Sequence, residues 1–265
     1  MKPPPKTKTK KVRRQSLATM LQAEAKLHAA LKASLVQATA VSTGPFVAAA
    51  IAQAASNLTK ALEPVILQGR SLARAKGHEG LKKELDLVNQ YAPQLGGEVE
   101  RAAHTAAGDA ARARYLAARF SRLWSEEAIK QATKSDSKSP GQIIRNTNQK
   151  RMFHLNAVAV SEPANAWNDE RQYEMQALVS TRQEKRRGLP LILAEEWSAV
   201  MDLRTCPECA DLNGGIRPIG FSWPHGFPPV HVNCRCALLL AIVPAYFEWD
   251  EDVGTITELK EVEAA

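Results

Sequence analysis

Cysteine is missing from most of this sequence. Residues 1–205 and 237–265 contain none, and all four cysteines lie between positions 206 and 236. Aromatic residues are also scarce at 6%, while alanine is frequent before residue 135. Few aromatics and much alanine predict helices that pack closely through small side chains. Cysteines gathered in one short stretch indicate a shared chemical role.

Long apolar runs are absent as well. No segment reaches the ~18 to 20 consecutive apolar residues that a membrane-spanning helix requires. The basic N-terminus is not followed by the apolar core of a signal peptide. We therefore expect no membrane partner and a protein that stays in the cytosol where it is made. In that compartment, clustered cysteines are more often metal ligands than disulfides.

Acidic residues are absent from the N-terminal end, where none precedes Glu24. Seven basic residues there account for the whole net charge of +7. Prolines combined with like charges keep a chain extended, so residues 1–15 are predicted to form a disordered basic arm. The alternative is that this arm contacts the phosphates of a nucleic acid. Such contact would be independent of sequence, because no aromatic residue is interleaved for base stacking. The candidate contact residues are Lys2, Lys6, Lys8, Lys10, Lys11, Arg13 and Arg14.

Residues 16–134 are predicted to form an alanine-rich helical region. The first helix is expected to begin at Ser16, whose side chain can cap it, and to stop at Gly44-Pro45. Shorter helices are expected over 46–62 and 81–91, with Pro64 marking a kink or a new start. Another helical piece is expected to end near Gly77.

The longest predicted helix covers Glu98–Lys134. Its apolar residues alternate at four- and three-residue steps, which is the spacing of a seam between packed helices. The seam consists of Val99, Ala103, Ala106, Ala110, Ala113, Ala117, Phe120 and Trp124.

The segment K-S-D-S-K-S-P-G predicts a linker over residues 135–141. A mixed domain is expected over 142–247 and an exposed acidic tail over 248–265. The predicted fold class is α+β, a mainly helical N-terminal region followed by a small domain of helices and an antiparallel sheet. Its expected helices and strands are Ile143–Val160, Pro163–Arg187, Trp197–Met201, Ile216–Ile219 and Cys236–Val243.

The cysteine cluster has metal-ligand spacing. Cys206-x-x-Cys209 supplies two thiolates from one turn, and His231-x-x-Cys234-x-Cys236 follows after a proline-rich loop. Structural zinc takes four ligands from cysteine and histidine, so five candidates compete for four positions. Three cysteines with His231 and an all-cysteine set both remain open. Zinc would then be the cofactor, stapling the two segments together.

Other interpretations of the cluster are weaker. Four reduced, partly buried cysteines beside a surface histidine would need no metal, and His225 is only a distant sixth candidate. A catalytic zinc needs an open position and a nearby general base. Asp202, Glu208 and Asp211 are close in sequence, but carboxylates beside a zinc turn are common. The sequence also has no phosphate-binding loop, H-E-x-x-H or G-x-S-x-G, so no enzyme is predicted.

The stretch D-L-R-T-C-P-E-C-A-D-L-N-G-G, followed by P-P-V-H-V-N-C-R-C-A-L, resembles the signature of the phage Mu F-like minor head proteins of tailed phages. Fifteen residues match in order. They are Asp202, Arg204, Thr205, Cys206, Cys209, Leu212, Asn213, Gly214, Pro228, Pro229, His231, Asn233, Cys234, Arg235 and Cys236. The resemblance covers about 35 residues and leaves the N-terminal half unmatched.

The resemblance implies a structural protein of the phage virion, made in the host cytoplasm and carried in few copies inside the capsid. Expected partners are the portal protein, the major capsid or scaffold protein, and packaged DNA. Expected roles are head assembly, DNA packaging or DNA delivery. The alternatives are a zinc-containing nucleic-acid-binding protein and a metal-dependent hydrolase or toxin acting through Asp202, Asp211 or His231.

Overall fold

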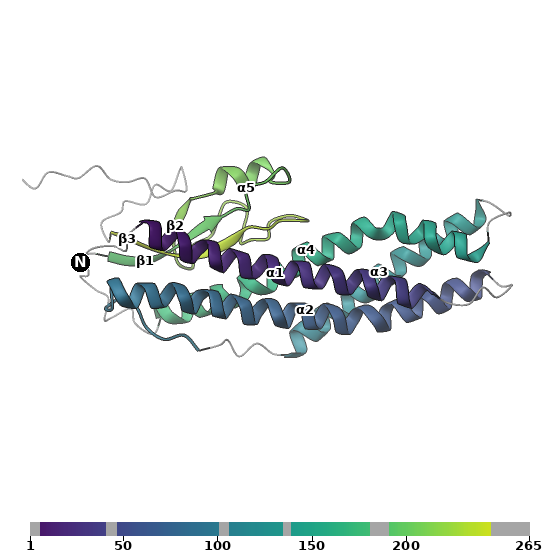
Figure 1. Cartoon of the computed structure of the whole chain (residues 1–265), viewed down its shortest axis with the longest axis horizontal. Coiled ribbons are helices and arrows are strands. Elements are labelled where there is room, and N and C mark those ends of the chain that lie inside the picture. Colours follow the sequence, from purple (N-terminus) through teal and green to yellow (C-terminus); the bar gives the residue numbers. More distant parts are fainter. Residues whose placement is uncertain (1–5, 41–46, 101–105, 135–138, 181–190, 245–265) are drawn as a thin grey trace, which may run out of the picture. The chain divides into compact units, whose positions relative to one another are not determined.

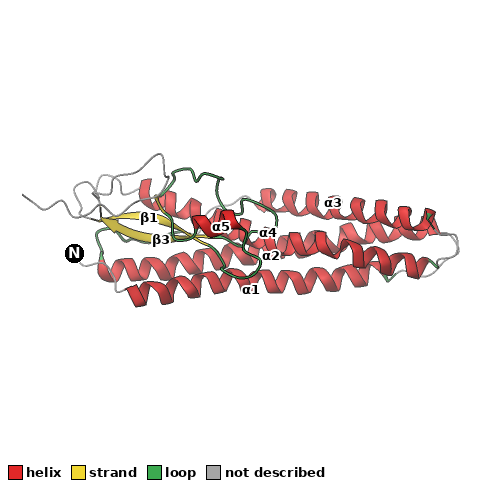
Figure 2. Ribbon diagram, turned by 90° about the horizontal axis from the view of Figure 1, so that it is seen from above, coloured by secondary structure: helices red, strands yellow, loops and turns green. Residues whose placement is uncertain are grey.

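The computed structural model of the 265-residue chain describes residues 6–40, 47–100, 106–134, 139–180 and 191–244. These residues are mostly helical and include one three-stranded antiparallel sheet, which confirms the α+β prediction (Figures 1 and 2). None of the described helices combines the length and apolar character needed to cross a membrane. The elements are α1 (Lys6–Thr39), α2 (Val47–Tyr91), α3 (Ala106–Thr133), α4 (Pro140–Ser180), β1 (Leu191–Ser198), α5 (Pro207–Leu212), β2 (Ile216–Pro218) and β3 (Ala237–Pro244).

The chain divides into two compact units, each assembled from distant segments. Unit 1 consists of Met1–Leu21, Ala73–Ala102 and Ala164–Ala265, and unit 2 consists of Gln22–Leu72 and Ala103–Pro163. Both units therefore draw on segments from each side of the predicted linker. A simple split into a helical N-terminal half and a mixed C-terminal half does not describe how these units are built.

Unit 2 has a helical core made of small and aliphatic side chains. Ala113, Ala117, Phe120 and Trp124 of α3 are all buried, which confirms this part of the predicted seam. Ala106 is exposed, because α3 begins there rather than at Glu98. Burial of the remaining core residues, which come from all four helices α1 to α4, supplies the main stabilisation of this unit. They are Leu27, Leu31, Leu35, Ala38, Ile51, Ala54, Leu58, Leu62, Ile66, Leu116, Ala128, Ile143, Ile144, Leu155 and Ala159.

Polar side chains inside unit 2 are paired with one another. Trp124 Nε1 donates to Asn148 Oδ1 at 2.7 Å, and Asn148 Nδ2 donates to Thr39 Oγ1 at 2.8 Å. This chain of hydrogen bonds connects α3, α4 and α1. The indole N–H and the amide are thus satisfied inside the helical core, as buried polar groups generally are.

An ionic cluster of three buried residues and the exposed Arg112 adds to the same unit. Arg70 of α2 contacts Asp109 at 2.8 Å and Glu162 at 2.5 Å, and Arg112 contacts Glu162 at 2.6 Å. Two guanidinium groups therefore neutralise two carboxylates. Loss of one member would leave a charge without its partner in a place where desolvation is costly.

The predicted breaks within α2 are wrong. Pro64 lies inside a continuous helix, where Leu62 and Ile66 are buried in the core of unit 2 and hold the backbone despite the missing hydrogen bond. Gly77 does not end a helix either. A Cβ atom at Gly77 would lie 2.8 Å from the carbonyl oxygen of Trp167, so glycine permits close packing of α2 on α4 within unit 1.

The same error recurs in α4, which was predicted as two helices separated before Pro163. Pro163 instead lies within one helix, Pro140–Ser180. The neighbouring residues Glu162 and Ala164 are both buried, so packing holds the helix through the proline. The predicted continuation to Arg187 and the acidic tail over 248–265 lie outside the described residues.

The predicted disordered arm is wrong for residues 6–15, which form the first turns of α1. Ser16 does not cap this helix, because it lies inside it, fully buried, and its hydroxyl donates to the Gly80 carbonyl at 3.3 Å. Arg13 pairs with Glu196 of β1. Contacts within unit 1 thus outweigh the charge repulsion that favoured an extended arm.

The sheet has the strand order β2-β1-β3, and both pairings are antiparallel. Strand β1 covers Leu191–Ser198 rather than the predicted Trp197–Met201, while β2 and β3 lie close to their predicted positions. Within β1, Leu193, Ala194, Glu195 and Trp197 are all buried. The three consecutive buried residues Leu193, Ala194 and Glu195 interrupt the alternation that normally reveals a strand.

The outer edge of β3 is covered by side chains instead of another strand. Asn168 Nδ2 donates to the Cys236 carbonyl at 2.9 Å, and Leu238 N donates to Asn168 Oδ1 at 3.0 Å. Arg171 Nε donates to the Leu238 carbonyl at 3.0 Å. Leu240 N donates to Glu84 Oε2 at 2.7 Å. These contacts satisfy an edge that would otherwise be open to pairing with another chain.

Candidate metal centre

The first half of the centre is built by the start of a short helix. Cys206 is the N-cap residue of α5, and its sulfur accepts a hydrogen bond from Cys209 N at 3.3 Å. Pro207 occupies the first helical position, where its missing N–H costs nothing. The Cys206-x-x-Cys209 spacing predicted only a turn here. The signal for the helix was present in Pro207 and in Glu208, an acidic residue in the first turn.

The second half is a tight loop that leads into β3. Cys234 N donates to the His231 carbonyl at 3.2 Å, and Asn233 between them has a φ of 65°. Asparagine tolerates this left-handed conformation better than most residues. The loop turns the side chains of His231 and Cys234 toward α5, and Cys236 follows immediately before Ala237, the first residue of β3.

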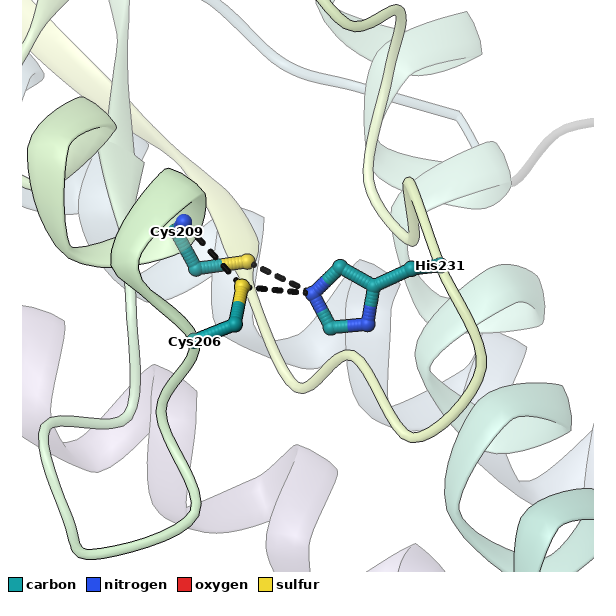
Figure 3. A group of neighbouring side chains, drawn as sticks. All are labelled: Cys206, Cys209 and His231. Carbon is teal, nitrogen blue, oxygen red and sulfur yellow. Dashed lines mark hydrogen bonds between the residues drawn. The ribbon is translucent and has the colours of Figure 1, made fainter.

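All five predicted ligands come together. The Nε2 atom of His231 lies 2.9 Å from Cys206 Sγ and 3.1 Å from Cys209 Sγ (Figure 3). Cys209 Sγ lies 3.7 Å from Cys234 Sγ. The ligand atoms form two groups, Cys206–Cys209–His231 and Cys209–Cys234–Cys236, each within 4.8 Å. Cys209 belongs to both groups, and none of the four cysteines is in a disulfide.

This donor set fits a tetrahedral metal ion. Zn–S bonds of ~2.3 Å place neighbouring sulfurs of a tetrahedral site about 3.8 Å apart, close to the distance between Cys209 and Cys234. His231 Nδ1 lies 2.9 Å from the Val232 carbonyl oxygen and can donate its proton there. Its Nε2 lone pair then faces the sulfurs, which is how metal-binding histidines are usually oriented.

The electrostatics of the cluster call for a cation. A hydrogen bond from Cys236 lowers the pKa of the Cys234 thiol to about 5. Burial raises the pKa of Cys209 to about 12, and the neighbouring Cys234 raises the pKa of Cys236. Several thiolates at this spacing repel one another, so they ionise together only when a positive ion compensates their charge. The group can therefore hold a metal ion.

The loop before α5 is fixed by polar contacts. Arg235 donates to both carboxylate oxygens of Asp202, at 2.7 and 2.5 Å, and this contact lowers the pKa of Asp202. Thr205 donates to the Val200 carbonyl and accepts from Asp202 N. Arg204 N also donates to Asp202. Asp202 is thus committed to holding the loop.

The other acidic and histidine candidates do not join the cluster. Asp211 and Glu208 are exposed on α5, and His225 is exposed in the connecting loop. None of the three belongs to either ligand group found among the described residues. Their proximity in sequence to the cysteines therefore reflects chain connectivity rather than a shared site.

A second polar site was missed by sequence reasoning. Glu195 of β1 is fully buried and accepts a hydrogen bond from Trp223 Nε1 at 2.7 Å. Burial raises the pKa of Glu195 to about 7. Arg217, whose guanidinium lies 4.9 Å from the centroid of the Trp223 ring, partly opposes this shift. The two adjacent glutamates in an otherwise apolar strand were the available signal.

The basic candidates have separate roles. Lys10, Lys11 and Arg14 are exposed on α1. Arg13 is partly buried and contacts Glu196 and the Leu240 carbonyl, so it belongs to the fold of unit 1. Lys6 and Lys8 lie within α1, and Lys2 lies outside the described residues.

Comparison with known families decides the relationship. Residues 121–239 match the model of the family described as phage Mu protein F like protein. This part of the chain is similar to the phage Mu F-like family. The match confirms the resemblance carried by the cysteine signature, and it starts within α3, upstream of the predicted boundary at 142. The family points to phage head morphogenesis. Neither the curated proteins nor the solved structures contain a match to this chain.

Proposed function

We propose that this chain is a structural, non-enzymatic minor head protein of a tailed phage. It would reside in the capsid interior beside the portal and act in head assembly, DNA packaging or DNA delivery. The observation that carries the proposal is the phage Mu F-like match over residues 121–239, which includes both halves of the Cys/His cluster.

Zinc is the proposed cofactor, and its role is structural. It would join the N-terminus of α5 to the 231–236 segment across the proline-rich loop. Cys209 is buried and Cys206 is partly buried. A closed structural site matches this burial better than a catalytic site with an open position. The engagement of Asp202 by Arg235 also argues against a nearby carboxylate acting as general base.

The stapled loops present apolar side chains to solvent. Leu203 is fully exposed, and Met201 and Val232 are 60% and 64% exposed. They come from two loops that are joined where Cys206 approaches His231 and where Asp202 pairs with Arg235. Contiguous patches of exposed apolar residues are typical of contact surfaces. We propose that this surface, Met201–Leu203–Val232, enters an apolar pocket on another protein of the phage head.

Quantitative mass spectrometry of purified virions and empty procapsids tests the head assignment. The expected result is a few copies of this chain in each particle. A Leu203→Ser/Val232→Ser variant should be incorporated less, while the matched control Ile129→Ser, at an exposed site on α3, should be incorporated normally. Absence of the wild-type chain from both particles, with abundant protein in the lysate, would contradict the proposal.

DNA contact is a second candidate function, favoured by the exposed Lys10, Lys11 and Arg14 on α1. Phosphate contacts release counterions, so the affinity for DNA should fall as the salt concentration rises. The logarithm of the binding constant should fall with the logarithm of the salt concentration, with a slope of about 0.9 per neutralised phosphate. Replacing these three residues with Gln should reduce that slope for any DNA sequence. A salt dependence that the triple variant leaves unchanged would remove α1 as the contact.

A further inference from the structure

Five candidate ligand atoms form two groups that share Cys209, whereas a tetrahedral metal site has four positions. Cys206 and Cys209 enter from α5, while His231, Cys234 and Cys236 enter from the segment before β3. We infer that Cys206, Cys209, His231 and Cys234 bind the metal, and that Cys236 is a positioning residue. This inference rests on the proposed zinc staple and specifies its ligands.

The two halves of the proposed set have the same construction. Each consists of two ligands separated by two residues, and in each the fourth backbone N–H bonds back to the first residue. Cys209 N donates to the sulfur of Cys206, and Cys234 N donates to the carbonyl of His231. Both turns therefore direct a pair of ligands to one side. Zinc sites are commonly assembled from two such closely spaced pairs.

His231 bridges the two halves. Its Nε2 atom lies within 3.1 Å of both α5 sulfurs, and its Nδ1 atom is engaged with the Val232 carbonyl. An all-cysteine site would leave this oriented lone pair without a function beside two thiolates. A histidine ligand uses the orientation that the fold has already imposed.

Cys234 and Cys236 differ in how firmly the backbone is held. The Cys236 carbonyl accepts from Asn168, and the adjacent Ala237 is paired with Ser198 in the sheet. A metal bound to Cys206 and His231 must draw one more sulfur inward from the Cys209–Cys234–Cys236 group. Cys234 can follow because it lies in the loop after Asn233, whereas the sheet and α4 fix Cys236 in place.

Cys236 then has a supporting role. Its sulfur lies within 4.8 Å of the sulfurs of Cys209 and Cys234. An S–H group donating to a metal-bound thiolate would orient that ligand and reduce its excess charge. Outer partners of this kind typically change metal affinity by about 10- to 100-fold when they are removed.

The test uses the full-length reduced chain and compares Cys236→Ser, Cys236→Ala, Cys234→Ser and His231→Ala. We expect Cys236→Ser, which keeps a donor, to bind one zinc with an affinity close to that of the wild type. Cys236→Ala should lose about 10- to 100-fold. Cys234→Ser and His231→Ala should each lose more than Cys236→Ala. Rescue by serine, but not by alanine, separates a positioning residue from a ligand.

Cobalt substitution gives an independent measurement, and its first reading, on the wild-type chain, requires no variant to fold. The intensity of the sulfur-to-cobalt charge-transfer bands should correspond to three Co–S bonds and should be unchanged in Cys236→Ser. Four Co–S bonds, or loss of metal in Cys236→Ser with retention in His231→Ala, would overturn the ligand assignment while leaving a zinc staple. A folded wild-type chain that binds neither ion would instead refute the proposed staple itself.

Discussion

The two compact units of this chain are stabilised in different ways. Unit 2 is all-helical, and its core is a continuous set of aliphatic, alanine and aromatic side chains with a few internal polar pairs. Unit 1 contains a three-stranded sheet, a long connecting loop and short elements. Its core includes three of the four cysteines and two tryptophans, Trp197 and Trp223.

The two units differ in how far their stability depends on polar side chains. A helix satisfies its own backbone, so unit 2 can be stabilised mainly by apolar burial. An edge strand and a long loop cannot do so. In unit 1, Asn168, Arg171 and Glu84 bind the backbone of β3, and the Cys/His cluster links the loop ends. Unit 1 should therefore be sensitive to metal, charge and pH, and unit 2 should be insensitive.

Removal of the proposed zinc should have the largest effect, and that effect should be confined to unit 1. Structural zinc contributes as much as ~10 to 16 kcal/mol in small zinc-finger peptides. Chelation, or the double change Cys206→Ser/Cys209→Ser, should abolish hydrogen-exchange protection over residues 191–244. Protection of α3 and of residues 47–72 should persist.

Cys236→Ser is the matched control for that experiment, because it removes a sulfur without removing a proposed ligand. Equal loss of protection in both units would show that they unfold together. No loss in either unit would show that the cluster contributes little to stability.

Replacing Arg171 with Met should destabilise unit 1 strongly. Arg171 is fully buried, contacts Glu84 at 2.6 Å and donates to the Leu238 carbonyl. Its loss leaves a buried carboxylate without its partner, which typically costs about 3 to 5 kcal/mol. Urea unfolding followed by tryptophan fluorescence measures the change.

The control for this change is Lys83→Met. Lys83 pairs with Glu79 at the surface, and exposed pairs of this kind contribute about 0 to 1 kcal/mol. If both variants lose the same stability, the polar contacts along β3 do not hold unit 1 together.

The stability of unit 1 should change with pH as Glu195 titrates. Its pKa is raised by burial from 4.5 to about 7, so the folded state keeps a proton that the unfolded state releases. Below pH 4.5 the residue has no effect, and stability is lost as pH rises from 4.5 through 7. The loss is at most about 3 kcal/mol, from 1.4 kcal/mol for each pKa unit.

Glu195→Gln isolates this contribution. The difference in unfolding free energy between wild type and variant should decline over that pH window and then level off. A difference that stays constant with pH would show that Glu195 is ionised in the folded state at all the values measured.

The smallest predicted effect lies in unit 2. Trp124→Phe removes the donor to Asn148 and leaves a partly buried acceptor without this partner, at a cost of about 1 kcal/mol. Thermal unfolding should show the same loss with and without chelator. A metal-dependent loss would mean that unit 2 also relies on the Cys/His cluster, contrary to the contrast drawn between the units.

Short-range patterns in the sequence predicted the structure correctly where the residues involved lie within one turn or along one helix. The spacing of Cys206, Cys209, His231, Cys234 and Cys236 located the candidate metal centre, because each close pair is brought together by a single turn. The seam from Ala113 to Trp124 was likewise recovered, since a helix repeats its own geometry. The family signature was visible in the same residues.

Residues that usually interrupt helices led to wrong predictions of where the helices end. Pro64, Gly77 and Pro163 all lie inside helices, because side chains around them are buried or a neighbouring backbone packs against them. The positive charge of the N-terminal arm also led to a wrong prediction of disorder. Residues 6–15 instead form the first turns of α1, where Arg13 pairs with Glu196. Local propensities of this size are smaller than the energy of tertiary packing.

The sequence by itself therefore determined the α+β class, the helical seam, the phage Mu F-like relationship and the set of candidate metal ligands. Only the tertiary structure decided that the units combine segments from both halves of the chain and that Glu195 is buried. It also decided that Asn168, Arg171 and Glu84 serve the backbone of β3. Glu84 and Leu240 are 156 residues apart, and no local pattern encodes a partner at that distance. Such contacts exist only once burial has brought the segments together and left each polar group in need of a partner.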